Sequence, residues 1–522
     1  MKNGELEINN GLPTGWAYAG LEDISDVDRH SIKRGPFGSA LKKEFFVPDG
    51  YKVYEQGNVI NNDFNRGTYF INDEKFEDLK SFSIKPKDIL MSCAGTVGKL
   101  AIVPNGVQEG VINQALLKLS VHPDIDLQYF FKLFTYQIDE ILKSNLRGSA
   151  MMNLTSVKDL KLVKFPIAPL NEQKRIVAKI EKLFSNLDNS DKYLLHLEKQ
   201  LKRYRQSVLK SAFEGELTKE WRKKQSNLET ADELLEKIKI EQTLYIENEI
   251  REKFKDKPEK WIKNKVENEV DKFYSALKPI EEDDKPFTIP TQWEWHLIQE
   301  STIKIHYGYT ATSDKNIDGI GYLRITDIQN NKVNWDEVPN CIISEEEVKK
   351  YELEDDNIVF ARTGATVGKS FLIKDIPIRS VFASYLIRLI PSNQIYSNYI
   401  YKFFQSPIYW NQIRENESGI GQPNVNAEKL SNLIFPLCSL EEQIEVVAEI
   451  EKHFSIIDKL ETVVQQSIKE SKRLRQSILK QAFEGKLVEQ DPNDESASVL
   501  LEKIAKAKEE YLKVQKKQTR KK

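Results

Sequence analysis

The sequence predicts an α+β protein made by tandem duplication, in which an α/β module is followed by a long α-helix and the two helices pack as an antiparallel coiled coil. Three observations predict this fold class. Residues 203–218 read RYRQSVLKSAFEGELT, and residues 473–488 read RLRQSILKQAFEGKLV. FPIAPLNEQ at Phe165 returns as FPLCSLEEQ at Phe435, and TVGK occurs twice, with 270 residues between the copies in each case. An apolar heptad pattern follows in both copies.

These repeats divide the chain into six regions. We expect a first module at 1–165, a first long helix at 166–217, a helical connector at 218–284, a second module at 285–435, a second long helix at 436–488 and a helical tail at 489–522.

The first module is rich in Gly, Pro, Asn and aromatic residues, and short runs such as DILMSCAG and QALLKLSV read as strands between turns. The second module opens with IPTQWEW where the first opens with LPTGWAY. Both modules are therefore expected to share one mixed α/β fold.

Each long helix is expected to begin just after a proline, Pro169 or Pro436, and to stop at a glycine, Gly215 or Gly485. A pseudo-two-fold axis between tandem halves favours antiparallel packing. The predicted packing seam consists of Ile180, Leu183, Leu187, Leu194, Leu197 and Leu201 in the first helix and Ile450, Ile457, Leu460, Val464, Leu474 and Ile478 in the second. The connector sequence ADELLEKIKIEQ is echoed by the tail sequence ASVLLEKIAKAKE, so both are expected to be helical.

Composition limits the functions to be considered. The three cysteines form no CxxC pair, and the six histidines show no ligand spacing, so we expect neither a disulfide framework nor a metal site. No signal-peptide or membrane-spanning run is apparent, which favours a cytoplasmic protein. A net charge of −3 gives no support to a nucleic-acid partner at the level of the whole chain, so only local basic patches favour one.

Two catalytic interpretations are weak. GATVGKS at 364–370 lacks the spacing of a phosphate-binding loop, which makes a turn between strands the better interpretation. SPIY at 406–409 resembles the short loop of amino-methyltransferases but lacks its second proline, and no Gly-rich cofactor segment accompanies it. A stand-alone methyltransferase or NTPase is therefore one alternative, and a coiled-coil scaffold without a DNA role is another.

Loops of both modules mix Arg or Lys with Gly, Ser, Asn and Gln, which are suitable residue types for phosphate contacts and base-edge readout as well as for ordinary loops. The candidate DNA-binding residues are Lys33, Arg34, Ser39, Arg66, Lys99, Arg147, Arg324, Arg362, Lys369, Gln422 and Asn424. No group of residues forms a catalytic constellation.

Taken together, the LPTGW-like opening, YLRITDI, ARTGATVGK, GQPNVN and the doubled helix motifs resemble the DNA-specificity subunit of type I restriction-modification systems. The resemblance implies that each module is a target-recognition domain for one half of a bipartite, asymmetric DNA site. It also implies catalysis by partners: two methyltransferase subunits that methylate adenine, and motor-nuclease subunits that cleave. S-adenosylmethionine and ATP are then used by the partners, with no cofactor in this chain. The helices are expected to act as a ruler, with the connector around 231–242 contributing to the gap between half-sites.

Overall fold

The computed structural model describes residues 11–37, 39–146, 156–329, 332–363, 367–415 and 425–519. It consists of two compact units. The first contains Met1–Leu194 and Gln466–Lys522, and the second contains Leu195–Gln465. Each unit thus combines one globular module with the beginning of the long helix that follows it and the end of the other long helix.

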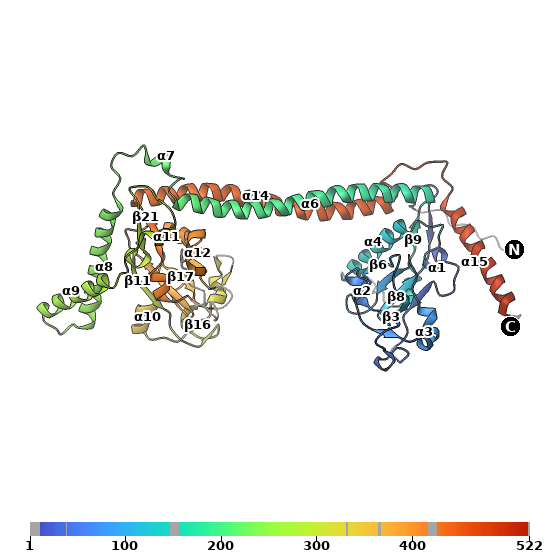
Figure 1. Ribbon diagram of the computed structural model, residues 1–522, viewed down its shortest axis with the longest axis horizontal. Helices are drawn as coiled ribbons and strands as arrows, with labels where there is room; N and C mark the ends of the chain where they lie inside the picture. Colours follow the sequence, from blue (N-terminus) through green and yellow to red (C-terminus); the bar gives the residue numbers. More distant parts are fainter. Residues whose placement is uncertain are drawn as a thin grey trace. The chain divides into compact units, whose positions relative to one another are not determined.

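Small sheets form the centre of the first module (Figure 1). One joins the start of the module to its end, because β1 (Ala17–Ala19) pairs with β9 (Phe165–Ile167). A second has the antiparallel order β2-β8-β5-β6, and a third has the order β4-β3-β7 with β3 and β7 parallel. Their strands are β2 (Ile32–Arg34), β3 (Tyr51–Tyr54), β4 (Phe70–Ile71), β5 (Ile89–Ser92), β6 (Leu100–Ile102), β7 (Gly110–Ile112) and β8 (Leu116–Leu119).

Helices cover these sheets. The helices of the first module are α1 (Leu21–Ile24), α2 (Gln56–Ile60), α3 (Asp73–Leu79), α4 (Leu127–Leu146) and α5 (Val157–Leu160). The apolar face of α4 enters the main core, where Phe130 and Phe134 pack edge-on against Phe165 of β9. Burial of such aromatic side chains is a major stabilising term of the module.

The second module repeats this plan. β10 (Glu294–Leu297) pairs with β21 (Ile434–Leu437), and the order β11-β20-β17-β18 matches β2-β8-β5-β6. Its other strands are β11 (Thr302–Tyr307), β12 (Ser313–Asp314), β13 (Ile320–Leu323), β14 (Ile328–Gln329), β15 (Lys332–Val333), β16 (Asn340–Cys341), β17 (Ile358–Ala361), β18 (Ser370–Leu372), β19 (Ser380–Phe382) and β20 (Leu386–Pro391), and its helices are α10 (Glu345–Tyr351), α11 (Ser397–Phe403), α12 (Pro407–Glu415) and α13 (Ala427–Ser431). The parallel pair β13 and β19 corresponds to β3 and β7.

The long helices α6 (Leu170–Phe213) and α14 (Leu440–Phe483) each contain 44 residues and pack side by side in antiparallel orientation (Figure 1), which confirms the predicted coiled coil. In the first unit, Arg475 pairs with Asp188 at 2.8 Å and with Asp191 at 2.9 Å. In the second, Arg205 pairs with Asp458 and with Glu461. The two sets of ion pairs are related by the internal repeat.

The register of this seam differs from the predicted one at alternate positions. Leu460 and Leu474 were expected in the seam, and this prediction is wrong, because they are 43% and 49% exposed. Ile180, Leu201, Ile450, Ile457, Val464 and Ile478 are buried as predicted, while Leu183, Leu187, Leu194 and Leu197 are half-buried.

Polar side chains account for the error. At the remaining seam positions, the residue that faces inward is the one after the predicted residue. These residues are Phe184 and Arg205 in α6 and Phe454 and Arg475 in α14. There Arg475 lies over the Phe184 ring at 5.3 Å and Arg205 over the Phe454 ring at 4.4 Å. An arginine stem covers apolar surface while its charged end meets an acid, so this seam accepts arginine where the apolar pattern favours leucine.

The repeated Glu-Gln sequence at the start of each long helix ties the helix to its own module. Gln173 accepts a hydrogen bond from the Asp126 backbone at 2.9 Å and donates to the Ala168 carbonyl at 2.8 Å. Gln443 does the same with Tyr396 and Cys438, at 2.9 Å in both cases. Each glutamine therefore fixes a loop of the module against the helix.

The repeated AFEG sequence binds the end of each long helix to the other module. Phe483 at the end of α14 packs against Tyr129 of the first module, and Phe213 at the end of α6 packs against Tyr399 of the second. Gly215 and Gly485 follow with φ of +76° and +69°, which confirms the predicted helix stops.

The connector forms α7 (Lys219–Arg222), α8 (Ala231–Lys253) and α9 (Glu259–Ser275), and the tail forms α15 (Ala497–Thr519). Gln242 of α8 donates to the Gln299 and Thr302 carbonyls of the second module. Lys508 of α15 makes the equivalent contact with the Glu22 carbonyl of the first. The connector and the tail therefore have one shared role, which is to brace a module. Among the described helices, none has the length and apolarity of a membrane span.

Candidate nucleic-acid interface

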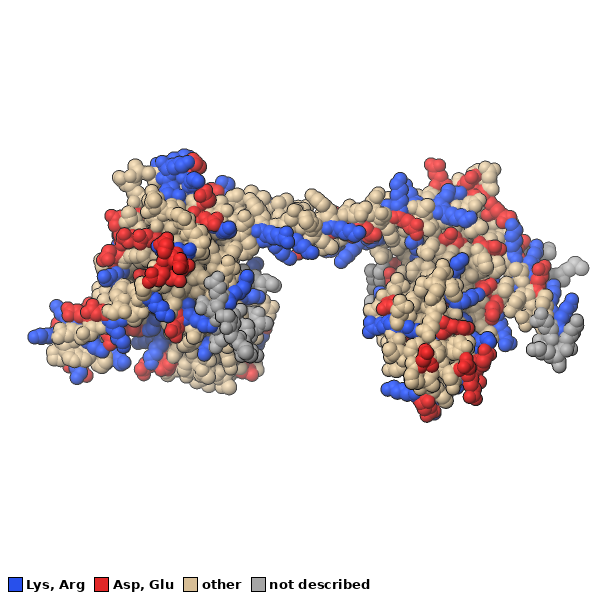
Figure 2. Space-filling model, viewed as in Figure 1, with Lys and Arg blue, Asp and Glu red and all other residues tan. Residues whose placement is uncertain are grey.

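Basic residues are spread over the modules among acidic ones. On the face shown in Figure 2, Lys and Arg side chains alternate with Asp and Glu on both modules, without one continuous basic face. This agrees with the net charge of −3. On this face electrostatics alone therefore does not mark a binding surface, and the candidate residues are judged by their local geometry.

In the first module the TVGK motif lies in the turn of the β5–β6 hairpin, and in the second Val367–Lys369 lie in the turn between β17 and β18, while 364–366 are outside the described residues. Gly98 and Gly368 have φ of +83° and +77°, and their N–H groups donate to the carbonyls of Ser92 and Ala361. The strands β6 and β18 follow the turns, where a phosphate-binding loop would lead into a helix. Lys99 and Lys369 are exposed beside these turns. The interpretation as a turn between strands is confirmed.

SPIY has a structural role. Ser406 is buried, and its hydroxyl accepts a hydrogen bond from the Tyr409 backbone at 3.3 Å, at the start of α12. The Tyr409 hydroxyl donates to the Gly368 carbonyl at 2.6 Å, so the segment supports the hairpin turn. The tyrosine is buried and not presented to a substrate.

The pairing of β2 with β8 and of β11 with β20 identifies equivalent positions in the two modules. Arg34 lies opposite Leu117, and Tyr307 lies opposite Ile387. The next residues are Gly35 and Gly308, where a Cβ atom would come within 1.8 Å of the Asn113 carbonyl oxygen and 2.3 Å of the Ala383 carbonyl oxygen. Only glycine permits this close approach of the backbones. Arg34 and Tyr307 therefore occupy the same place, each just before an obligatory glycine.

A second equivalent pair lies on the neighbouring strand. The Cys93 N–H donates to the Ala115 carbonyl at 2.7 Å, and the Arg362 N–H donates to the Tyr385 carbonyl at 3.1 Å. The hairpin of the second module is one residue longer, since Ser92 bonds to Lys99 whereas Ala361 bonds to Lys369. Cys93 and Arg362 thus occupy one structural position.

In the first module, two candidates already have partners within the protein. Lys33 donates to the Ser81 hydroxyl at 2.5 Å and lies over the Phe82 ring at 4.0 Å, while burial lowers its pKa. Arg34 donates through Nε to the Gln114 carbonyl at 3.2 Å. Ser39 and Arg66 are exposed. Burial raises the pKa of the Cys93 thiol to about 11, and the charge of Arg34 opposes the rise.

In the second module, Arg324 forms a bidentate pair with Asp327, at 3.0 Å from Nε and 2.8 Å from Nη2, which raises the pKa of the arginine. It therefore fixes the local turn. Arg362 lies over the Tyr307 ring, with its guanidinium carbon 4.7 Å from the ring centre. Arg147, Gln422 and Asn424 lie outside the described residues.

Exposed aromatic residues lie in both modules besides the candidates predicted from the sequence. Phe37 in the first module and Tyr385 in the second are 82% and 64% exposed. Phe37 stands in the sequence RGPFGS, where neighbouring glycines were a usable signal. Tyr385 has no comparable sequence signal, because its place beside Arg362 follows from the pairing of β17 with β20.

The described part of the chain contains no group of three or more His, Cys, Asp or Glu side chains arranged to hold a metal ion. Its cysteines, Cys93, Cys341 and Cys438, are free and buried.

Comparison with known proteins identifies the family. The family model described as "Type I restriction modification DNA specificity domain" matches residues 13–199 and 303–470. The chain is 26% identical to the type I restriction enzyme EcoBI specificity subunit of Escherichia coli, over 96% of this chain and 93% of that protein. It is also 26% identical to the EcoKI specificity subunit of E. coli K12, over 94% of this chain and 95% of that protein.

Solved structures share the fold. A chain from the structure described as "Structural basis underlying complex assembly and conformational transition of the type I R-M system" has a TM-score of 0.59 at 16% identity, with 91% of this chain and 99% of that chain covered. The duplicated modules, the paired helices and the two matched segments all agree, and the chain belongs to the family of type I restriction-modification DNA specificity proteins.

Proposed function

We propose that this chain is the non-catalytic subunit that gives a type I restriction-modification complex its DNA sequence specificity. Each module reads one half of a bipartite, asymmetric site in double-stranded DNA. One observation carries the proposal: two modules with the same strand order differ at equivalent positions, with Arg34 and Cys93 in the first and Tyr307 and Arg362 in the second. A common scaffold with different side chains is what two different half-sites require.

Catalysis belongs to partner subunits in this proposal. Two methyltransferase subunits methylate adenine with S-adenosylmethionine, and motor-nuclease subunits use ATP and cleave unmodified DNA. The candidate phosphate loop is a hairpin turn and the SPIY tyrosine is buried, which removes the sequence support for a stand-alone enzyme.

The long helices offer surfaces for two copies of one partner. Tyr193 and Val463 are exposed at positions related by the repeat, as are Tyr204 and Leu474. Exposed apolar side chains that recur in this way are typical of protein interfaces. Because the pairs are related by the pseudo-two-fold repeat, we propose that they bind the two methyltransferase subunits.

Single-molecule methylation mapping tests the function. DNA from cells with the gene and from cells in which it is deleted would be compared, with the partner genes intact in both. The proposal expects the loss of one bipartite adenine-methylation motif on deletion, and restoration of that motif when the gene is returned on a plasmid. A motif that persists after deletion contradicts the proposal.

A further inference from the structure

The position shared by Cys93 and Arg362 has a feature that neither packing nor ion pairing explains. The Arg362 backbone is fixed on both sides, since its N–H donates to the Tyr385 carbonyl at 3.1 Å and its carbonyl accepts from the Val425 N–H at 3.2 Å. The Tyr307 ring under its guanidinium is fixed as well, because the Tyr307 hydroxyl accepts from the Ala427 N–H at 3.1 Å. Arg362 is therefore held in place by a rigid frame.

The guanidinium itself lacks the usual partners. Within the described ranges, its Nε atom is buried without a hydrogen-bond partner and no carboxylate forms an ion pair with the guanidinium. A guanidinium carries five N–H donors and no acceptor, so an arginine without a carboxylate partner has donors that the acceptors of a ligand can satisfy. Tyr385 is exposed beside it, which leaves the approach open.

The first module also has an arginine at this junction, but it lies on β2, the strand equivalent to β11, and not after β5, the strand equivalent to β17. Arg34 stands where the second module has Tyr307, and Cys93 and Ala115 stand where it has Arg362 and Tyr385. Arg34 of β2 and Met91 of β5 both lie opposite Leu117 of β8, and Cys93 follows Met91 by two residues. The two modules thus exchange which strand carries the arginine while keeping one arginine at this junction.

We propose that Arg362 reads a guanine in the half-site of the second module, through two N–H groups directed at O6 and N7 in the major groove, and that Arg34 reads a guanine in the half-site of the first. This inference rests on the proposed function and deepens it. A planar guanidinium stacked on an aromatic ring presents a fixed pair of donors, which fits the paired acceptors of guanine. A phosphate contact would not require such a frame, because it needs only positive charge.

The test uses the chain expressed with its methyltransferase subunits in a host without other adenine methylation, read by single-molecule methylation mapping. For Arg362→Ala we expect the second module's half-site to become degenerate at one guanine, with methylation of the original motif about 10- to 100-fold lower and the other half-site unchanged. Arg34→Ala is expected to relax one guanine in the other half-site. Arg362→Lys keeps the positive charge but loses the paired N–H donors of the guanidinium. We expect it to relax base specificity at the same guanine as Arg362→Ala.

Arg251→Ala serves as the matched control, because this arginine pairs with Glu247 and Glu259 within the connector, and the methylation motif of this variant should not change. A uniform fall in methylation with an unchanged motif for both Arg362 variants would overturn base reading in favour of a phosphate contact. An unchanged motif with a normal level of methylation would show that Arg362 makes no functional contact with DNA. Absence of a bipartite motif with the unaltered chain would instead contradict the proposed function, so the two failures are distinguishable. Co-purification with the methyltransferase verifies that each variant folds.

Discussion

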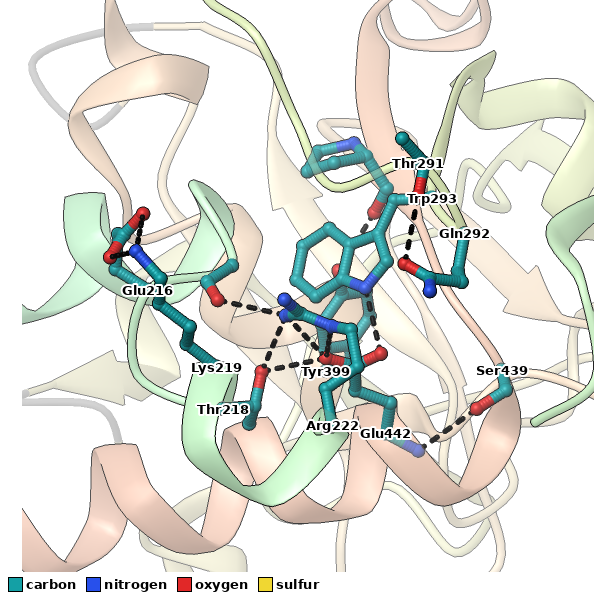
Figure 3. A network of polar contacts seen from close by, with 12 residues as sticks. Glu216, Thr218, Lys219, Arg222, Thr291, Gln292, Trp293, Tyr399, Ser439 and Glu442 are labelled. Atoms are coloured by element: carbon teal, nitrogen blue, oxygen red, sulfur yellow. Dashed lines mark hydrogen bonds and ion pairs between the residues drawn. The ribbon is translucent and has the colours of Figure 1, made fainter. Parts of the chain in front are cut away.

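Trp293 Nε1 donates a hydrogen bond of 2.8 Å to Glu442 Oε2, which joins the opening motif of the second module to the first turn of α14 (Figure 3). The other carboxylate oxygen, Oε1, accepts from the Thr218 hydroxyl at 2.7 Å and from Arg222 Nε at 2.8 Å, both beyond the end of α6. One buried carboxylate thus ties together three segments that are far apart in the sequence. Ser439, just before α14, accepts a hydrogen bond from the Glu442 backbone N–H at 3.2 Å.

The first module has half of this network. Trp16 Nε1 donates to Glu172 Oε2 at 3.1 Å, but Glu172 Oε1 is buried without a partner among the described residues. The positions that match Thr218 and Arg222 are Val488 and Pro492, which carry no donor. Arg175 turns instead to Asp494 at 2.7 Å. The two junctions are therefore a natural comparison of a complete and an incomplete network.

Replacing Glu442 should cost more stability than replacing Glu172. Glu442→Ala leaves the largely buried Arg222 unpaired, and we expect a loss of about 3–5 kcal/mol in the free energy of unfolding. Glu172→Ala removes one hydrogen bond to Trp16, with an expected loss of about 1–3 kcal/mol. Denaturation in urea followed by tryptophan fluorescence measures both. Equal losses would mean that the Arg222 contacts contribute nothing.

Glu172 should make stability depend on pH. Burial raises the pKa of its carboxyl above the usual value, and the Trp16 hydrogen bond and the charge of Arg175 oppose this only in part. A raised pKa in the folded state means that the folded chain holds the proton more tightly, so this contribution is complete below the unfolded pKa and is lost as pH rises through the folded pKa.

Glu172→Gln should therefore be more stable than the unaltered chain at neutral pH, with the difference shrinking as the pH is lowered. Unfolding in urea at several pH values between neutral and mildly acidic would reveal the trend. A difference that stays constant, or that grows toward acid, would contradict it.

Gly485 should tolerate alanine poorly for two separable reasons. Its φ of +69° disfavours any side chain, and a Cβ atom would come within 2.2 Å of Pro13 Cγ in the first module's opening motif. Gly106 is the matched control, because its φ is +74° and a Cβ atom there meets nothing within 4 Å. We expect Gly106→Ala to cost about 1 kcal/mol and Gly485→Ala clearly more. Thermal unfolding compares the two variants. Equal decreases in Tm would show that the contact with Pro13 adds nothing to the effect of the positive φ.

The register of the coiled coil can be tested at two adjacent residues. Arg475→Ala removes the cover of Phe184 and the pairs with Asp188 and Asp191, and should cost about 1–2 kcal/mol. Leu474→Ala should change stability by less than about 0.5 kcal/mol, because the side chain is half exposed. Leu474→Ala should nevertheless weaken co-purification with the methyltransferase if the proposed docking surface is correct. The reverse order of stabilities would restore the register expected from the apolar pattern.

The duplication made much of this fold predictable from the sequence. Helix ends follow from local chemistry, and Gly215 and Gly485 stop their helices as expected because only glycine readily adopts the positive φ that they require. The predicted seam includes Ile180 and Ile457, which are fully buried. It failed at Leu474, because the adjacent Arg475 gains more from covering Phe184 and pairing with acids than its polarity suggests.

The candidate site was harder to predict. Arg34 and Arg362 were both selected from sequence, but their relation was not, since it depends on strand pairing and on a hairpin that is one residue longer in the second module. Arg324 was selected on the same grounds, yet the structure pairs it with Asp327. The sequence shows which arginines the modules contain. Whether an arginine already pairs with a carboxylate of the protein depends on the fold.

We now expect the long helices, and not the connector, to set the gap between the two half-sites. Because Gln242 binds the second module through the Gln299 and Thr302 carbonyls, an insertion in α8 should disturb this brace and leave the gap between half-sites unchanged. Seven residues added to the middle of both α6 and α14 keep the heptad register and lengthen the pair by about 10 Å. At about 3.4 Å per base pair, the gap should then grow by about three base pairs, with both half-sites unchanged. Methylation mapping of the two insertion variants decides between them, since a gap that responds to α8 and ignores the paired helices would identify the connector as the spacer.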